Sequence, residues 1–568
     1  MDYNMKNTSF EAIVIGSGIS GGWAAKELCE KGIKTLMLER GKDIKHREDY
    51  HSDFTQPWET IGKGKLNEDI LNRDYPVQQK SHVINEYSHD RFIKDPDNPY
   101  IQTSPFAWIR GHHTGGKSIM WGRQSYRLSE LNLSENQRDG HGSPWPVRYS
   151  DLDPWYSYVE EFAGISGNND GIDVLPDGNF LKPMEMNCLE KHVSGSITEN
   201  FPDRRMIIGR AAHLTETKPV HEALGRSNCM YRNQCVRGCS FGGYFSTQSA
   251  TLPAARNTGN LTLMNNKVVL RILHDEASGR ATGVEVVDQL TMEKTQYFAR
   301  VVFVCASTLG STQILLNSAS SAFPQGLGNS SGVLGHYLMD HNIGAIVVGK
   351  YSGFEDKYYK GRRPNGIYVP RFQNIGDDKR DFLRGYGFQG GASRTDWAKQ
   401  AQEKGFGKTL KEKVSTPGDW SMVLVGFGEM LPDFNNKVTL DTTQKDKWGM
   451  PLLNVDAKWG ENEHKMTDDM IVSGKEMLEA AELTQVFGFK TGSEPGTGIH
   501  EMGTARMGDD PTQSVLNKFN QMHDVKNVFV TDGSAMASTA CQNPSLTYMA
   551  MTARAVDYAV KEMQAGRI

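Results

Sequence analysis

The segment that most restricts the fold lies within the first forty residues. A short apolar run at 11–15 (EAIVI) ends in a glycine-rich turn with Gly16, Gly18 and Gly21, followed by a helix-forming stretch and a second apolar run, KTLMLERG. Gly16 permits the tight turn, Gly18 lets the backbone approach a pyrophosphate, and Gly21 lets the helix pack closely on the strand. The order strand, turn, helix, strand predicts a Rossmann-like α/β unit.

A carboxylate completes this pattern. Glu39 ends the second apolar run, 18 residues after Gly21, where it is placed to accept hydrogen bonds from a ribose diol. The N–H groups at the start of the helix face the phosphates of such a ligand. A glycine-rich turn alone can be structural, but the strand, the helix and the acid agree here. The sequence predicts a dinucleotide site, and its position at the N-terminal end of the chain favours FAD over NAD.

A second pair of polar residues stands near the other end of the chain. His500 lies in the block GTGIHEMGTARMG, and Asn543 follows 43 residues later. Between them, KNVFVTDGSAM indicates a buried strand at 528–531. A helix then follows, for which Asn543 is the expected N-cap and Pro544 the first helical residue. Read separately, His500 could be a hydrogen-bonded loop histidine and Asn543 only a cap.

Three of the seven cysteines, Cys229, Cys235 and Cys239, have the spacing C-x5-C-x3-C in a loop rich in Gly, Asn and Arg. Such thiols can form a disulfide, bind zinc, hold an iron–sulfur cluster or remain inert. Zinc prefers four ligands, whereas the nearest histidine, His221, lies eight residues before Cys229. A disulfide would leave one thiol over, and the odd total argues against a complete disulfide framework.

Bulk properties exclude two kinds of partner. The 568 residues carry a formal charge of -5 with no strong basic stripe, which argues against nucleic acid. No run of 18 apolar residues occurs, so we expect no membrane span. The first ten residues, MDYNMKNTSF, contain no apolar signal core, so we expect the chain to carry no export address of its own.

Five ordered blocks resemble the glucose–methanol–choline (GMC) oxidoreductases. They are GSGISGG with Glu39, RGHHTGGKSIMWGRQS from Arg110, VVFVCASTLGSTQILLNS, HEMGTARMG, and DGSAMASTACQNPSLTYMAMTARA, and the resemblance is collinear over residues 11–560. It implies an α/β fold, in which a Rossmann-like FAD-binding domain is interleaved with an α+β substrate domain built on an antiparallel sheet. The implied FAD-binding pieces are 8–45, 100–125, 245–320 and 500–565, the substrate-domain pieces are 46–99, 126–228 and 321–499, and 229–244 is a separate loop.

The resemblance also implies roles for individual residues. His500 would take the hydroxyl proton of an alcohol and Asn543 would hydrogen-bond the same oxygen, because a hydride leaves readily only from an alkoxide-like carbon. Met120 stands where pyranose oxidases carry the histidine that tethers FAD, so we expect non-covalent FAD unless His112 or His113 forms a bond. The residues expected to bind the cofactor are Gly16, Gly18, Gly21, Glu39, Arg110, Gly115, Gly116, Ser118, Trp121, Val268, Asp532, Gly533, Asn543 and Pro544.

The cysteine spacing resembles that of the bacterial FAD-dependent sugar dehydrogenases within this family. There, three thiolates hold a [3Fe-4S] cluster, which makes Cys229, Cys235 and Cys239 the expected iron ligands. A cluster implies a dehydrogenase that passes electrons to cytochrome c or a quinone. The alternatives are a pyranose-oxidase-like enzyme that attacks C2 and uses dioxygen, and an FAD-containing electron-transfer subunit without its own substrate.

Similarity to glucoside 3-dehydrogenase large subunits gives the most specific expectation. It implies oxidation of the C3 hydroxyl of glucose or a glucoside, and a small partner subunit carrying a twin-arginine signal. The chain would then reach the periplasm by co-export, with a cytoplasmic location as the alternative. Tyr368, Gln389 and Glu429 could contact a sugar, but pocket and core residues look alike in one sequence, so the sequence assigns none of them.

Overall fold

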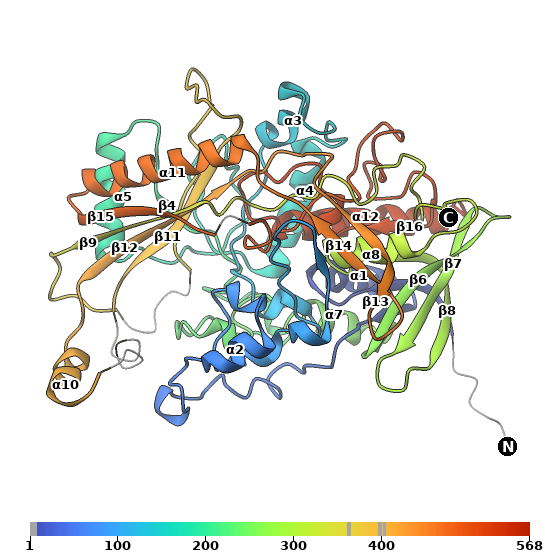
Figure 1. Ribbon diagram of the computed structural model, residues 1–568, viewed down its shortest axis with the longest axis horizontal. Helices are drawn as coiled ribbons and strands as arrows, with labels where there is room; N and C mark the ends of the chain where they lie inside the picture. The colour runs from blue at the N-terminus through green and yellow to red at the C-terminus, as the bar shows by residue number, and fades with distance from the viewer. Residues whose placement is uncertain (1–7, 360–364, 396–399, 401–404, 493) are drawn as a thin grey trace.

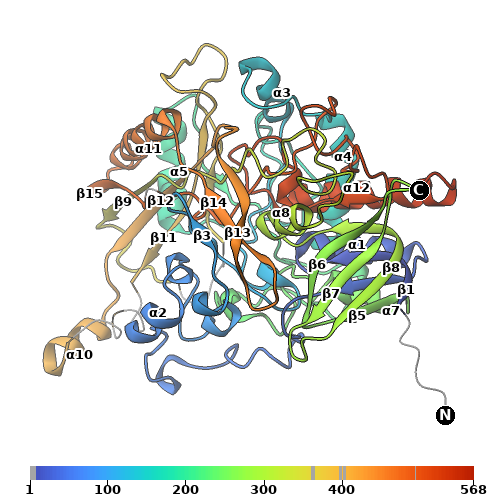
Figure 2. The ribbon, with the colours of Figure 1, turned by 45° about the vertical axis from the view of Figure 1, so that its right-hand side comes forward.

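Two large sheets on opposite sides of the molecule organise the chain (Figures 1 and 2). The computed structural model describes residues 8–359, 365–395, 400, 405–492 and 494–568. The first and last parts of the chain meet in one sheet, and the second sheet is formed mainly by the 345–490 region. This arrangement confirms the predicted α/β fold with a separate antiparallel sheet.

The nucleotide-type sheet has the strand order β5-β2-β1-β8-β7-β6, and β16 also pairs with β8. β1 runs parallel to β2 and β8, whereas β6, β7 and the start of β8 are antiparallel. The last four residues of β1 are buried, as expected for a central parallel strand. The strands are β1 (Ser9–Ile15), β2 (Thr35–Leu38), β5 (Leu261–Met264), β6 (Lys267–Asp275), β7 (Arg280–Asp288), β8 (Lys294–Val304) and β16 (Val528–Val530).

Three helices from distant parts of the chain pack beside this sheet: α1 (Ile19–Glu30), α7 (Thr251–Asn257) and α12 (Ser545–Gln564). α1 approaches β1 so closely that a Cβ on Gly21 would lie 1.9 Å from the carbonyl oxygen of Gly16. Gly16 has a φ of +93°, which favours glycine. Both observations match the roles predicted for these two glycines.

The second sheet has the order β15-β9-β12-β11-β10-β4. Its pairs are antiparallel, and β12 alternates strictly between buried and half-buried residues, so the two faces meet different surroundings. One face packs against helices α5 (Cys188–Asn200) and α11 (Glu461–Ala480). The strands are β4 (Ile207–Ile208), β9 (Ala345–Tyr351), β10 (Ile367–Val369), β11 (Tyr386–Arg394), β12 (Trp420–Gly428) and β15 (Thr484–Lys490).

The remaining elements cover the two sheets or join them. A small sheet contains β3 (Ile101–Gln102), β13 (Lys437–Lys445) and β14 (Pro451–Asp456). The other α-helices in the described part of the chain are α2 (Glu68–Asp74), α3 (Glu130–Asp139), α4 (Tyr149–Ala163), α6 (Pro219–Glu222), α8 (Thr308–Asn317) and α10 (Gly407–Ser415). Among the described helices, none combines the length and apolar character needed to cross a bilayer.

The structure corrects the expected start of the last helix. α12 begins at Ser545 and its N-cap is Pro544, which leaves Asn543 one position before the cap. The Asn543 side chain does not cap the helix, because its Oδ1 accepts a hydrogen bond from Gln389 instead. A tertiary partner has therefore replaced the local capping bond that the sequence pattern predicts.

Candidate active site

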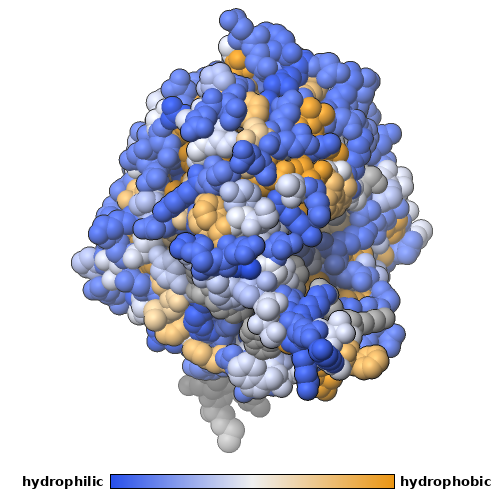
Figure 3. Space-filling view, turned by 90° about the vertical axis from the view of Figure 1, so that its left-hand side faces the viewer, coloured by the Kyte–Doolittle hydropathy of each residue, from blue (hydrophilic) through white to orange (hydrophobic). Residues whose placement is uncertain are grey.

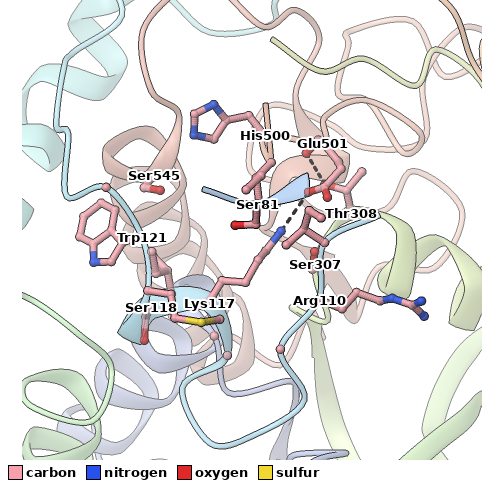
Figure 4. A pocket seen from close by; sticks show the side chains of 18 of the residues that line it. Ser81, Arg110, Lys117, Ser118, Trp121, Ser307, Thr308, His500, Glu501 and Ser545 are labelled. Carbon is pink, nitrogen blue, oxygen red and sulfur yellow. Dashed lines mark hydrogen bonds and ion pairs between the residues drawn. The ribbon is translucent and has the colours of Figure 1, made fainter. Parts of the chain in front are cut away.

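A cavity of about 950 Å³ is lined by residues of both large sheets. The lining includes the glycine turn, Glu39 and Val268 from the nucleotide-type sheet and its connections. His500 and Asn543 line the same cavity together with Gln389 of the second sheet. Figure 4 shows that the labelled side chains come from segments far apart in the chain. The volume falls within the usual range for sites that bind small molecules and cofactors.

The structure gathers most of the predicted site residues at this cavity. The lining includes Gly16, Gly18, Glu39, Arg110, Gly116, Ser118, Trp121, Cys235, Val268, His500, Asp532 and Asn543. It does not include Gly21, Gly115, Gly533, Pro544, Cys229 and Cys239. Close backbone packing explains two of these: a Cβ on Gly533 would lie 2.4 Å from the carbonyl oxygen of Glu501, and Gly21 faces Gly16.

The glycine turn is open toward the cavity at Gly18. A Cβ added there would meet no atom within 4 Å, whereas one added at Gly16 would lie 2.5 Å from the carbonyl oxygen of Cys305. Gly18 is also the N-cap residue of α1, and it has no side chain that could bond the first N–H groups of the helix. The empty space and the free helix N-terminus together form a cradle suited to a phosphate group.

Three protein donors hold the Glu39 carboxylate. Its Oε2 accepts from the Ser17 amide at 3.1 Å and the Ser17 hydroxyl at 2.5 Å, and its Oε1 accepts from the Gly41 amide at 2.8 Å. Burial raises the pKa of Glu39, while the bonds from Ser17 and Gly41 oppose that rise. Each carboxylate oxygen can accept further hydrogen bonds, so the fixed group remains available to a ribose diol.

Several buried polar atoms around the cavity have no hydrogen-bond partner among the described residues. Native proteins satisfy the large majority of buried polar groups, so such atoms indicate a missing ligand. The carboxylate of Glu39, the open turn at Gly18 and these atoms fit the ribose, phosphate and ring atoms of a bound FAD. The unpartnered atoms of lining residues include Arg110 Nε, Arg123 Nη1, Glu501 Oε1 and Tyr548 OH.

A pair of histidines fixes the proton on His500. His341 Nε2 lies 2.9 Å from the Ala540 carbonyl oxygen and must donate to it, since a carbonyl only accepts. Burial lowers the pKa of His341 to about 4, so its Nδ1 carries a lone pair at neutral pH. His500 Nδ1 lies 2.8 Å from that nitrogen and therefore donates its proton there. The network leaves His500 Nε2 unprotonated, as a general base requires.

The surroundings also keep His500 neutral. Burial lowers its pKa well below the usual 6.5, and His341 and Lys117 add to the effect. The backbone amide of His500 donates to Asp340 Oδ1 at 2.9 Å, while Oδ2 of the same carboxylate accepts from Gly496 and Gly498. Asp340 thus holds the loop that carries His500 in place.

Asn543 is oriented by a side chain of the second sheet. Gln389 on β11 donates from Nε2 to Asn543 Oδ1 at 2.6 Å. With its oxygen engaged, Asn543 has its amide N–H groups left as donors. His500 therefore presents a lone pair to the cavity, and Asn543 presents an N–H donor. This combination suits an alcohol group that must give up a proton while its oxygen is stabilised.

An ion pair involves Glu501, the residue that follows His500 in the chain. Lys117 Nζ lies 3.1 Å from Glu501 Oε2, and Figure 4 shows the lysine reaching across the cavity toward the segment that holds His500. The Glu501 side chain is 3% exposed and that of Lys117 is 28% exposed. The pair is therefore positioned to influence charges that form in the cavity, because charges interact more strongly there than in water.

The three cysteines of the expected ligand set, Cys229, Cys235 and Cys239, lie in one loop segment. All three are free thiols, and the described part of the chain holds no group of three His, Cys, Asp or Glu side chains arranged for a metal ion. Cys235 lies in a short 3-10 turn, lines the cavity, and has its sulfur 3.6 Å from His213 Nε2. Burial raises the pKa of the Cys229 thiol to about 12, and charge on Cys235 or Cys239 adds to this rise.

Comparison with known proteins identifies the family. The chain matches the amino-terminal GMC oxidoreductase model over residues 10–343 and the carboxy-terminal model over residues 432–552. It is 28% identical to the 2-methyl-1,2-propanediol dehydrogenase of Mycolicibacterium austroafricanum, with 96% of this chain and 94% of that protein covered. It is 24% identical to the fructose dehydrogenase large subunit of Gluconobacter japonicus, with 98% and 99% covered.

The fold has relatives among solved structures. The pyridoxine 4-oxidase of Mesorbium loti superposes with a TM-score of 0.58 at 14% identity, covering 97% of this chain and 99% of that one. With the cavity described above, these matches define the class: the chain is an FAD-dependent oxidoreductase that acts on the CH–OH group of alcohols. It belongs to the GMC oxidoreductase family.

Four residues of this site were not predicted from the sequence: His341, Asp340, Lys117 and Glu501. His341 lies 159 residues from His500 in the chain, and no local pattern indicates that they meet. Lys117 and Glu501 both lie inside blocks that resemble the family, next to the predicted site residues Ser118 and His500. Their charges at these positions could have marked them as site residues. Gln389, which the sequence assigns no role, lines the cavity and is bonded to Asn543.

The pH dependence of the first half-reaction follows from the charge state of His500. As the candidate base, His500 acts when neutral, and burial holds its pKa well below 6.5, so flavin reduction should be independent of pH above that pKa and decline only in more acidic solution. Lys117→Met removes a cation that lowers this pKa, so the acidic decline should move to higher pH, while Lys117→Arg should not move it. Stopped-flow profiles check both statements, and an unshifted Lys117→Met profile would contradict the second.

Gln389 should matter through the amide that it orients. In Gln389→Leu, Asn543 Oδ1 loses its donor, and the amide becomes free to turn its oxygen toward the substrate. We expect kcat/KM to fall about tenfold or more for every alcohol tested, the scale of one lost hydrogen bond to a charged transition state. FAD content should not change. Gln389→Glu cannot donate when ionised and should resemble Gln389→Leu; full activity in both variants would refute this role.

Proposed function

We propose that the protein oxidises a secondary hydroxyl of glucose or a glucoside, at C3, to a keto sugar. The observation that carries the alcohol chemistry is the chain of hydrogen bonds that leaves a lone pair on His500 Nε2, in the cavity that the donor amide of Asn543 also lines. The sugar assignment is supported by the sequence resemblance to glucoside 3-dehydrogenases and by the similarity to the fructose dehydrogenase large subunit.

In this proposal, His500 and Asn543 both act on the oxygen of the substrate hydroxyl. The substrate hydroxyl donates to His500 Nε2, which takes the proton as the C–H bond breaks. The Asn543 amide donates to the same oxygen and stabilises the negative charge that develops there. Bound FAD supplies the acceptor for the hydride that leaves carbon. His341 holds the imidazole in the required tautomer throughout.

Product analysis tests the substrate and the carbon attacked. Glucose and methyl glucoside are incubated with the holoenzyme and an artificial electron acceptor, and the keto carbon is located by NMR. We expect 3-keto products. A 2-keto product would favour a pyranose-oxidase-like enzyme, and oxidation only of small diols would point instead to chemistry like that of the 2-methyl-1,2-propanediol dehydrogenase.

The route of the electrons is proposed from the cysteine spacing and from the place of Cys235 at the cavity. We expect about three iron atoms per chain in anaerobically purified protein, with an oxidised-state EPR signal, since a [3Fe-4S] cluster needs three cysteines. Cys229→Ser should lose the signal and transfer to cytochrome c, whereas Cys188→Ser, a substitution outside the loop, should retain both. Iron-free protein that reduces dioxygen would identify an oxidase.

We also propose a small partner subunit with a twin-arginine signal, which would bring the chain to the periplasm. The resemblance to glucoside 3-dehydrogenases and the similarity to a chain named as a large subunit support this. Co-expression with the product of a neighbouring small-subunit gene should move the chain to the periplasmic fraction. A chain that remains in the cytoplasm under those conditions would refute the proposal.

A further inference from the structure

The face of the second sheet that is turned away from α11 carries an unusual run of apolar side chains. Its first row contains Gln389, Val425, Ile346 and Phe489, which are paired across β11, β12, β9 and β15. Gln389, Val425 and Ile346 line the cavity, and Gln389 is bonded to Asn543. This row therefore begins at the catalytic pair and continues outward to the edge strand β15.

A second apolar row lies beyond the first. Val423, Val348 and Phe487 are paired in register on the same face, one step of two residues farther along the strands, or about 7 Å. The next row is polar, because Ser393, Ser421 and Lys350 occupy it. The apolar surface is thus two rows deep and ends at a defined polar border.

We call this surface the apolar apron and define it as Ile346, Val348, Val423, Val425, Phe487 and Phe489. Phe487 is 55% exposed and Phe489 is 45% exposed, and the other four are half-buried. On the opposite face, Val347 and Leu424 are fully buried under the helices. Figure 3 looks at the side of the molecule that carries β15 and shows exposed hydrophobic residues among hydrophilic ones.

Continuity with the cavity indicates what the apron binds. Ile346 and Val425 belong to both surfaces, so a molecule that places a hydroxyl between His500 and Asn543 can extend over the apron without a break. We propose that the apron binds an apolar group carried by the substrate beyond its reacting ring, so that the enzyme favours alkyl or aryl glycosides over free sugars. This inference rests on the proposed function, which places the ring at the catalytic pair.

Substrate preference tests the inference. The kcat/KM for octyl β-glucoside, below its micelle-forming concentration, should exceed that for glucose by about tenfold or more, from the burial of roughly 60 Å² of apolar surface. The double variant Phe487→Ser/Phe489→Ser should remove most of this preference, chiefly through KM, and leave glucose kinetics unchanged. Equal values for the two sugars in the wild-type enzyme would overturn the inference and leave the sugar oxidation intact.

Two further variants serve as a control and as an alternative to the double variant. Val472→Ser is the matched control, since Val472 is also 55% exposed but lies on α11, on the other side of the sheet. It should leave the preference unchanged. Val423→Thr preserves shape and strand propensity in case the double variant fails to fold, and it should lower the preference in the same direction. A loss of preference in Val472→Ser alone would count against the apron.

Binding of 1,2-decanediol separates this inference from the sugar assignment. If neither sugar is oxidised, calorimetry with the holoenzyme still reports whether the apron holds an alkyl chain. Weaker binding in the double variant but not in Val472→Ser would support the apron while the sugar assignment fails. Light scattering tests whether a second copy of the chain occupies the apron instead. A wild-type dimer that the double variant converts to monomer would assign the surface to that second copy and overturn the inference.

Discussion

His500→Ala should slow the reduction of bound FAD by substrate about a hundredfold to ten-thousandfold, the usual contribution of a general base. The structure gives the reason, since His500 Nε2 is the nitrogen that the His341 bond leaves unprotonated. FAD should stay bound, because the predicted phosphate and ribose contacts lie at Gly18 and Glu39. Rapid mixing under anaerobic conditions measures the flavin bleaching directly and avoids the later electron steps.

A surface histidine provides the control for this experiment. His51→Ala removes an imidazole whose side chain is 80% exposed, and it should reduce flavin at the wild-type rate. The pH profile adds a readout that a purely structural defect would not give: the acidic decline assigned to His500 should disappear from the residual activity of His500→Ala. Turnover at the wild-type rate in His500→Ala would show that another group takes the proton.

The glycine turn should separate cofactor binding from folding. In Gly18→Ala the new methyl group enters open space at the cavity, so the fold should persist while FAD affinity falls by about tenfold or more as the methyl meets the phosphates. In Gly21→Ala the new Cβ would lie 1.9 Å from the Gly16 carbonyl oxygen, between backbone atoms that cannot move apart cheaply. We expect that variant to lose about 3 kcal/mol of folding free energy.

Two measurements distinguish the variants. Titration of apoprotein with FAD should show weakened binding in Gly18→Ala, with the denaturation midpoint of the apoprotein unchanged. Gly21→Ala should shift the apoprotein midpoint itself. Gly32→Ala, at a position with φ of +81° and open space around it, estimates the cost of backbone strain alone. Equal losses of apoprotein stability at Gly18 and Gly21 would contradict the distinction between ligand contact and helix packing.

Much of the nucleotide half was predictable because its signals are local. The turn at Gly16 to Gly21 and the acid at Glu39 work through residues within one supersecondary unit: in the structure the turn joins β1 to α1, and Glu39 directly follows β2. The antiparallel second sheet was implied by the family resemblance, and the alternation of buried and half-buried residues along β12 agrees with it. The helix boundary at Asn543 was not predictable, because its Gln389 partner lies 154 residues away.

The sequence by itself determined the family, the type of fold and the candidate catalytic pair, because ordered blocks and local periodicity depend only on the order of residues along the chain. Only the tertiary structure decided how that pair works. The proton on His500 depends on His341, the orientation of Asn543 depends on Gln389, and the ion pair beside them joins Lys117 to Glu501. Each is a hydrogen bond or ion pair between segments far apart in the chain, and folding alone brings such partners within bonding distance.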